Sequence, residues 1–194
     1  SCYENYRWLP DLTTKMALRM IKNLSIKTGE KVLDFWCAKG FLVKAFRNLW
    51  LESYWCDISE YAIENADFDT KKFCKLINND YIDVIPFDFY FDWIISKDVL
   101  EHMTETVLDI FLKQALQKTQ KMFHVVPLWD WKKFYISEFD NDKSHVLVQE
   151  MEWWKNKFRE NWWKIKKASH AFNWVKDKWT AEYKNWHWFF ILEK

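Results

Sequence analysis

The chain has 194 residues, a length that suits one domain with a substantial buried core. Its 29 Lys and Arg residues nearly balance its 28 Asp and Glu residues, which argues against a bulk electrostatic attraction to nucleic acid or to a membrane surface. A run of about 18 apolar residues and a basic-then-apolar signal pattern are both missing from the sequence, so we expect a cytoplasmic protein without a membrane partner.

The first half of the chain predicts helices that alternate with short strands. Apolar residues between positions 12 and 24 recur with helical spacing and predict the first helix. The next elements, in order, are a strand at 31–35, a helix with an apolar face from Leu42 to Leu49, a strand at 52–57, a helix that Ser59 caps and that runs to Asn65, a weak strand at 73–76 and a strand at 91–96.

The second half continues the alternation. The predicted elements are a helix that Thr104 caps, with an apolar face from Leu108 to Ala115, then a strand at 121–126, an irregular stretch at 127–144, a helix at 150–160, and strands at 163–169 and 187–192. The irregular stretch is too long for a plain connection and is therefore a candidate functional loop. Strands and helices that alternate in this way indicate an α/β fold with a parallel sheet and helices on both faces.

Cysteine, glycine and tryptophan usage set further expectations. The four cysteines contain no CxxC pair, which predicts no metal site and fits free thiols in a reducing compartment. An average chain of this length would contain roughly 14 glycines, yet this one has only 2, together with 15 tryptophans. The glycine deficit and the tryptophan excess are similar in size, so their positions deserve comparison.

A strand, a tight loop and a helix follow one another from Val32 to Gly40. This arrangement directs backbone N–H groups and a helix N-terminus toward a ligand at the carboxyl edge of a sheet. Asp57 ends the next predicted strand, where its carboxylate can accept hydrogen bonds from both ribose hydroxyls of a nucleoside. We therefore expect a nucleoside-containing cofactor at this edge.

Four ordered motifs resemble those of class I S-adenosylmethionine (SAM)-dependent methyltransferases, in their small-molecule branch. They are the stretch from Val32 to Gly40, the segment Cys56-Asp57-Ile58-Ser59, the pair Asn79-Asp80, and the segment 91–102, which reads FDWIISKDVLEH. The resemblance implies a Rossmann-like seven-stranded, mostly parallel sheet whose last strand is antiparallel. It also implies SAM as cofactor and a small-molecule acceptor as substrate.

The resemblance carries specific residues over to the cofactor site. The loop after the first strand supplies Asp34, Trp36, Ala38 and Gly40, and the acid that holds the ribose is Asp57. Further cofactor contacts are implied beside the ribose and adenine and at the methionine end, namely Ile58, Asn79, Asp80 and Lys97. The implied organisation of residues 1–194 is a helical segment (1–27), a cofactor-binding half (28–126) and a substrate-side loop with C-terminal strands (127–194).

A nicotinamide-binding domain is the nearest alternative with the same local geometry. Its G-x-G-x-x-G pattern would require glycine at positions 36, 38 and 41, which are Trp36, Ala38 and Phe41 here. The methyltransferase pattern has glycine at 36, 38 and 40, and Gly40 fits it. The segment 91–102 further favours the methyltransferase interpretation.

Trp36 is the main departure from the family pattern. It stands at the first motif glycine, where the backbone approaches the ligand closely and a side chain would occupy the ligand's space. Our hypothesis is that tryptophan has also replaced glycine at other positions where related enzymes turn, namely Trp50, Trp55, Trp129, Trp131, Trp162, Trp174, Trp186 and Trp188. A second interpretation of the chain follows, a non-catalytic domain that keeps the fold and no longer binds SAM.

Two histidines are candidates for a general base, because imidazole titrates near neutral pH. They are His102 and His145, and each has the alternative role of a surface or packing residue. Glu101 precedes the helix cap and is interpreted only as a favourable charge at the helix N-terminus. The Lys- and Trp-rich stretch 155–167 is interpreted as a solvated face and not as a nucleic-acid surface. The sequence does not indicate an oligomeric state.

Overall fold

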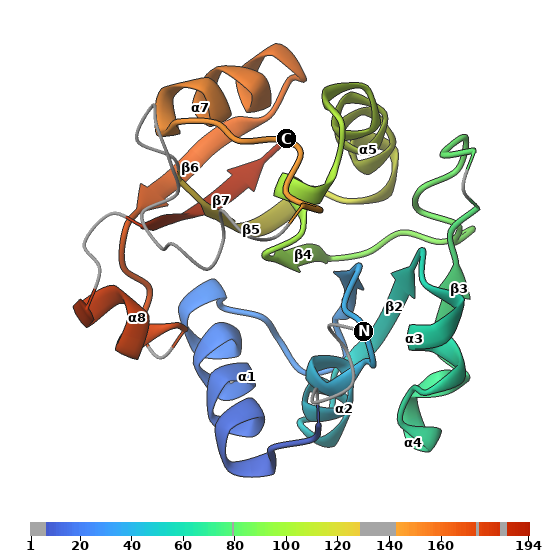
Figure 1. Cartoon of the computed structure of the whole chain (residues 1–194). Helices are drawn as coiled ribbons and strands as arrows, with labels where there is room; N and C mark the ends of the chain where they lie inside the picture. The colour runs from blue at the N-terminus through green and yellow to red at the C-terminus, as the bar shows by residue number, and fades with distance from the viewer. Residues whose placement is uncertain (1–6, 79, 129–142, 174, 183–185) are drawn as a thin grey trace.

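The computed structural model describes residues 7–78, 80–128, 143–173, 175–182 and 186–194, apart from the side chains of 178 and 179. Its strands form one seven-stranded sheet in the order β3-β2-β1-β4-β5-β7-β6 (Figure 1). The strands are β1 (Lys31–Phe35), β2 (Glu52–Asp57), β3 (Cys74–Leu76), β4 (Trp93–Lys97), β5 (Lys121–Pro127), β6 (Lys164–Ser169) and β7 (His187–Glu193). The helices are α1 (Pro10–Leu24), α2 (Phe41–Asn48), α3 (Glu60–Glu64), α4 (Phe68–Lys71), η1 (Leu100–His102), α5 (Glu105–Lys118), α7 (Met151–Glu160) and α8 (Asp177–Glu182).

The sheet is mostly parallel, as predicted. β1 pairs in parallel with β2 on one side and with β4 on the other, so the direction of strand succession reverses between β1 and β4. In open α/β sheets such a reversal opens a crevice at the carboxyl ends of the strands, where ligands bind. β7 is antiparallel to both of its neighbours, β5 and β6, which confirms the expected antiparallel last strand.

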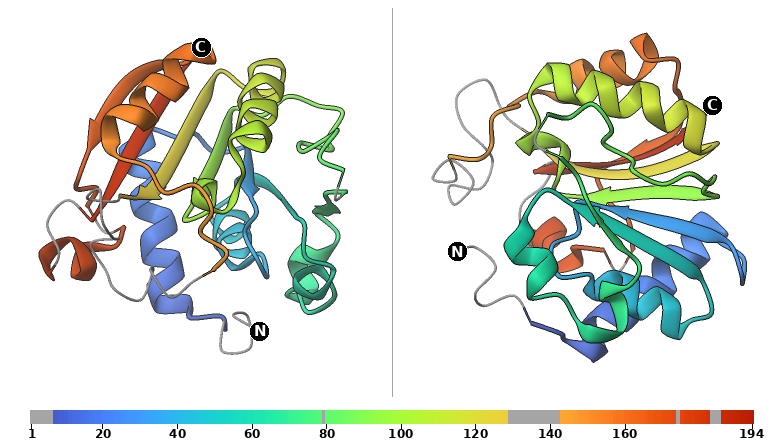
Figure 2. Two further views of the ribbon diagram at one scale, coloured as in Figure 1. Left: turned by 45° about the horizontal axis from the view of Figure 1, so that its top comes forward. Right: turned by 90° about the vertical axis from the view of Figure 1, so that its right-hand side faces the viewer.

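Helices cover both faces of the sheet (Figures 1 and 2). One apolar cluster joins α5 and α7 to one face, and its members Phe111 and Phe158 are fully buried. The other cluster joins α1 and α2 to the opposite face, with Met20 and Phe46 fully buried. Alternate residues of β1 enter the two clusters, because successive side chains of a strand point to opposite faces.

The predicted helix caps are confirmed. The Ser59 side chain accepts a hydrogen bond from the Ala62 N–H at 3.2 Å, and the Thr104 hydroxyl accepts from the Val107 N–H at 3.4 Å. α4, α8 and η1 were not predicted from the sequence, because elements of three to six residues are too short for a recognisable periodicity. β4 begins at Trp93, two residues later than predicted, since Phe91 forms only an isolated bridge.

The expectation that the basic stretch 155–167 is a solvated face was wrong for Lys157 alone, since its other Lys and Arg residues are exposed or half-buried. Lys157 lies on the covered side of α7 and is only 6% exposed. Its ammonium group lies 2.6 Å from Glu105 Oε1 and 3.2 Å from Asp109 Oδ1, both on α5. The amphipathic pattern could not reveal this, because a lysine that pairs with acids on a neighbouring helix looks like a solvated one in the sequence.

Three tryptophans occupy the left-handed region of backbone space. The φ angles are 54° at Trp36, 65° at Trp50 and 68° at Trp162, a conformation in which bulky side chains are strained and glycine is favoured. In contrast, Trp55 and Trp188 lie within β2 and β7 and do not have positive φ, so neither has the backbone conformation that favours glycine. The φ angle of Trp186 depends on residue 185, which lies outside the described residues. The replacement of glycine at these three positions stays a prediction. Positions 129, 131 and 174 lie outside the described residues.

Trp50 and Trp162 stand at equivalent places after α2 and α7. The N–H of Trp50 donates to Arg47 O, and the next N–H in the chain donates back to Phe46 O. The same two bonds follow α7, from Trp162 to Arg159 O and from the next residue to Phe158 O. This pair of bonds is the Schellman motif, whose left-handed residue is usually glycine.

Candidate functional site

The loop between β1 and α2 lies at the carboxyl edge of the sheet, beside the end of β2. The Trp36 N–H donates to Cys56 O at 2.8 Å, which holds the loop against β2. Gly40 begins α2 with a φ of 73°, and a Cβ at this position would lie 2.9 Å from Thr70 Oγ1 and 3.1 Å from the Trp55 ring. Gly40 is therefore required both by its backbone conformation and by its neighbours.

Asp57 ends β2 and connects two segments of the site. Its Oδ2 accepts the Ala38 N–H and its Oδ1 accepts the Ser59 N–H, each at 2.9 Å. Burial raises the pKa of Asp57, while the backbone N–H groups act in the opposite direction. A carboxylate offers about four acceptor positions, so both oxygens can accept further hydrogen bonds from ribose hydroxyls.

Asp34 is buried within β1, one residue before the loop. Burial raises its pKa to about 7, and a hydrogen bond from Cys37 and the charge of Lys97 oppose this rise. Because the carboxyl group is close to half-ionised at neutral pH, it can serve as a donor or as an acceptor toward a ligand.

The Trp36 side chain packs toward the face that α5 and α7 cover. Its ring stacks on Phe35 with centroids 5.6 Å apart and lies 6.5 Å from the ring of Tyr81. It is half-buried against the α5 and α7 cluster, so the alternative in which the indole packs beneath α2 is wrong. The Trp36 Nε1 is buried and has no hydrogen-bond partner among the described residues.

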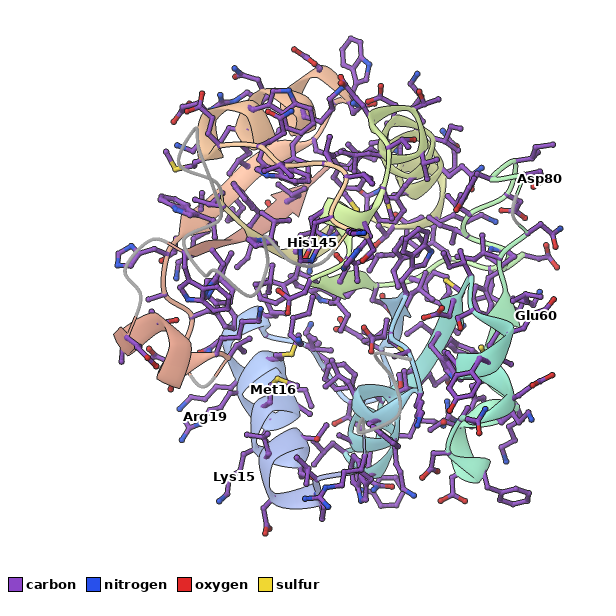
Figure 3. All side chains as sticks on the ribbon, in the orientation of Figure 1. Lys15, Met16, Arg19, Glu60, Asp80 and His145 are labelled. Atoms are coloured by element: carbon purple, nitrogen blue, oxygen red, sulfur yellow. The ribbon has the colours of Figure 1, made fainter. Side chains whose placement is uncertain are left out.

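Tyr81 joins the site and was not predicted from the sequence. It follows the pair Asn79-Asp80, has a φ of 55° and is half-buried next to Trp36. Asn79 lies outside the described residues. Asp80 is exposed and accepts the Ile82 N–H at 3.1 Å (Figure 3), which stabilises the turn.

The other predicted cofactor contacts lie beside β2 and β4. Ile58 follows Asp57 and packs, half-buried, against the α5 and α7 cluster. Lys97 ends β4 and its Nζ lies 3.0 Å from Asp98 Oδ2. Asp98 also pairs with Lys176, so it belongs to an ion-pair network and not to a simple surface turn. Burial acts to raise the Asp98 pKa, but Lys176 and Lys97 outweigh it and lower that pKa.

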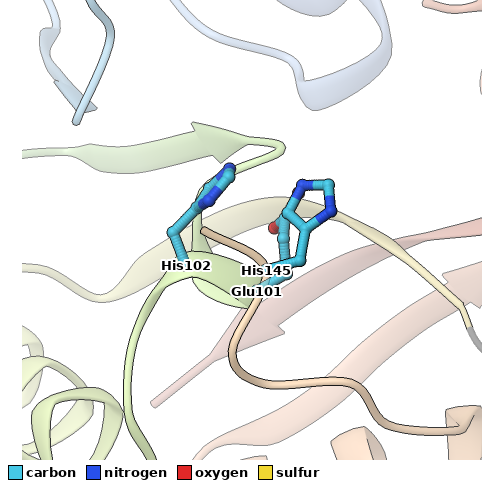
Figure 4. Close-up of side chains that lie close together, drawn as sticks. All are labelled: Glu101, His102 and His145. Carbon is cyan, nitrogen blue, oxygen red and sulfur yellow. The ribbon is translucent and has the colours of Figure 1, made fainter. Parts of the chain in front are cut away.

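Both predicted base candidates lie close together, with Glu101 beside them (Figure 4). The ring centroids of His102 and His145 are 4.6 Å apart. Ligand atoms of Glu101, His102 and His145 all lie within 4.8 Å of one another. The sequence predicted no chemical role for Glu101 and no metal site. The structure instead brings together three side chains that could bind a metal ion.

Two surface hollows of the described structure are lined by other segments. One lies between α2 and α4 and is lined by residues that include Lys44 and Phe73. The other lies on α1 beside Lys15 and Lys22. Neither is lined by Trp36, so the loop at position 36 does not face either hollow.

Part of the chain is similar to a known protein family. Residues 33–121 match the family described as a methyltransferase domain. No curated protein sequence matches the chain. Among the described residues, no helix is long and apolar enough to cross a membrane.

Solved structures share the fold at low sequence identity. A SAM-dependent methyltransferase from Clostridium acetobutylicum ATCC 824 matches with a TM-score of 0.71 at 8% identity, over 99% of this chain and 96% of that one. A SAM-dependent methyltransferase from Archaeoglobus fulgidus matches with a TM-score of 0.69 at 16% identity, over 95% and 97%. Geranyl diphosphate C-methyltransferase from Streptomyces coelicolor A3(2) matches with a TM-score of 0.68 at 10% identity, over 95% and 80%.

The strand order, the loop before α2 and the acid at the end of β2 agree with the family match over residues 33–121. Residues 33–121 thus resemble a methyltransferase domain, and the chain shares the fold of solved SAM-dependent methyltransferases.

Proposed function

We propose that this protein transfers a methyl group from SAM to a small-molecule acceptor. The observation that carries the proposal is the position of Asp57, whose buried carboxylate ends β2 beside the β1–α2 loop. One structural neighbour acts on geranyl diphosphate, a small molecule. Another neighbour is a methyltransferase in complex with the Trm112 activator from Haloferax volcanii, so the neighbours differ in their partners.

Different residues at the carboxyl edge of the sheet would bind different parts of SAM. Asp57 would hold the ribose, Gly40 allows the backbone to approach at the N-terminus of α2, and Ile58 and Asp80 would lie on the adenine side. SAM supplies a methyl group that the sulfonium already activates, so the protein mainly aligns donor and acceptor. His102 or His145 would accept the proton that an O–H or N–H acceptor releases.

A second function is favoured by Trp36, namely that of a domain that keeps the fold without binding SAM. Asp57 would suit the ribose, whereas the half-buried indole of Trp36 would stand where the resemblance implies bare backbone. The two functions differ in one measurable property, the affinity of the protein for SAM.

Replacing Asp57 by alanine is expected to weaken SAM binding by about 1.5–3 kcal/mol, because hydrogen bonds to a charged acceptor are lost. Isothermal titration of SAM into the wild type and the variant measures the difference. Asp92→Ala is the matched control, since Asp92 also accepts a backbone N–H, that of Lys31 at 2.7 Å, but at the amino end of β1.

The control is expected to leave the SAM affinity unchanged. Equal affinities of the wild type and Asp57→Ala would remove Asp57 from the cofactor site. Absence of SAM binding by the wild type would instead favour the non-binding domain.

A further inference from the structure

Glu101 is a buried acid whose carboxylate oxygens lack partners. The residue is 1% exposed, and neither Oε atom has a hydrogen-bond partner among the described residues. A buried carboxylate without hydrogen bonds is costly, and most such groups in proteins are paired or coordinate a metal. The side chains of His102 and His145 lie next to this carboxylate (Figure 4).

Backbone hydrogen bonds hold the two histidine-bearing segments together. The N–H groups of Val146 and Leu147 both donate to the backbone carbonyl of Glu101, at 3.0 and 2.9 Å. The Nδ1 of His102 lies 3.0 Å from the Ser144 hydroxyl and 3.2 Å from the Ser144 carbonyl. The segment after position 142 is therefore anchored to η1, and the cluster does not depend on a chance approach of two side chains.

Nearby charges do not satisfy Glu101. Lys97 and Lys176 both form ion pairs with Asp98. A cation at the cluster would stabilise the ionised carboxylate that the protein leaves unpaired.

We propose that Glu101, His102 and His145 bind a divalent transition-metal ion at the carboxyl end of β4. The donor set would be one carboxylate oxygen and one ring nitrogen from each imidazole, a combination that suits Zn²⁺, Fe²⁺ or Co²⁺ better than Mg²⁺ or Ca²⁺. Because Ser144 contacts Nδ1 of His102, the ligand from this residue would be Nε2, with the ring orientation set by the serine.

Three protein ligands leave coordination positions open for a substrate. The ion would bind an oxygen of the acceptor and lower the pKa of a hydroxyl group there, so the acceptor class would be molecules with hydroxyl or phosphate oxygens. With the metal bound, the ion would take over the activation of the acceptor, because an imidazole that ligates a metal has no basic nitrogen left to accept a proton. This statement on the acceptor rests on the proposed methyl transfer. Metal binding itself does not, since it needs no SAM.

A titration with Co²⁺ in the absence of SAM tests the site, with visible absorption and the melting temperature as readouts. The wild type is expected to bind one ion and to melt at a higher temperature when bound. Glu101→Gln and His145→Ala are each expected to weaken binding at least tenfold. His170→Ala is the matched control, because His170 is exposed elsewhere on the chain, and it is expected to bind like the wild type.

The outcomes distinguish a failure of the proposed metal site from a failure of the proposed SAM binding. Absence of Co²⁺ binding by the wild type, or equal binding by wild type and His145→Ala, would overturn the metal site and leave the SAM-binding test untouched. A strong thiolate charge-transfer band would place the ion on cysteine and would equally overturn it. His145 is only half-buried, so its variant remains informative even where Glu101→Gln folds poorly.

A second inference rests on the backbone at positions 36, 50 and 162. All three tryptophans have positive φ, and two of them end helices through the hydrogen bonds that usually select glycine. Trp50 and Trp162 are each 80% exposed, so packing offers little to offset the strain. By contrast, Trp163 is buried and its Nε1 donates to Leu112 O at 3.1 Å, as a packed tryptophan should.

We propose that positions 36, 50 and 162 are encoded by the same codon, and that the source organism translates this codon as glycine. Genetic codes differ in their reading of UGA, which specifies tryptophan in some and glycine in others. A single reassigned codon explains both the shortage of glycine and the excess of tryptophan. It also explains why tryptophan recurs in backbone conformations that glycine prefers.

Sequencing the gene tests the proposal, with Trp163 as the matched control. UGA is expected at positions 36, 50 and 162, and UGG at position 163. Peptide masses of the protein from the source organism are expected to show glycine at the first three positions and tryptophan at the fourth. UGG at the first three positions, or tryptophan masses there, would overturn the inference.

Discussion

Trp36→Gly is expected to create SAM binding or to tighten it at least 100-fold, equivalent to about 2.7 kcal/mol. The substitution removes an indole from the loop where the methyltransferase family has bare backbone, and it relieves the strain of a tryptophan at a φ of 54°. Thermal melts with and without SAM measure the effect, because a ligand that binds the native state raises the melting temperature. Calorimetric titration gives the affinity.

Trp50→Gly is the control for this experiment. It also removes a tryptophan with positive φ, but at the end of α2 opposite to the cofactor loop, so the SAM affinity is expected to stay unchanged. A folded Trp36→Gly protein whose melting temperature does not respond to SAM would contradict the assignment of the β1–α2 loop as the cofactor site. Combining the substitution with Ala38→Gly, at a φ of 62°, would exclude residual strain in the loop as the cause.

The double substitution Trp50→Gly and Trp162→Gly is expected to raise the free energy of unfolding by about 3 kcal/mol. Each left-handed non-glycine residue costs about 1–3 kcal/mol, and the greater freedom of glycine in the unfolded chain offsets about 0.5–1 kcal/mol of this gain at each site. Both side chains are 80% exposed, so little packing is lost. Urea denaturation of the two proteins measures the difference.

Trp163→Gly provides the contrast, because this neighbouring tryptophan is 1% exposed and donates to Leu112 O. Its loss is expected to destabilise the protein by about 3–5 kcal/mol, as for other large buried side chains. A double variant no more stable than the wild type would show that the two Schellman turns tolerate tryptophan without strain.

The sequence predicted the parallel part of the sheet well. β1 and β2 have the predicted bounds, because short buried strands between polar turns are distinctive, and Asp57 stands at the expected strand end. The short helices α4 and α8 could not be predicted, since one or two turns hold too few residues to show a period.

The site was only partly predictable for a different reason. His102 and His145 were both identified as candidates, but their contact depends on how the chain after position 142 returns to η1. Glu101 was interpreted from its local place before a helix, whereas its burial and unpaired oxygens come from the packing around it. Side chains that meet across a fold leave no regular spacing in the sequence.

The order of strands has a consequence for how the protein is made. β7 (His187–Glu193) lies between β5 and β6 and pairs with both, although it is the last of the three to leave the ribosome. Until it emerges, β5 and β6 each present an unpaired edge, the kind of surface on which chains associate wrongly. The nascent protein therefore cannot close its sheet until residues 187–193 have left the ribosome, and the two unpaired edges stay exposed to aggregation up to that point.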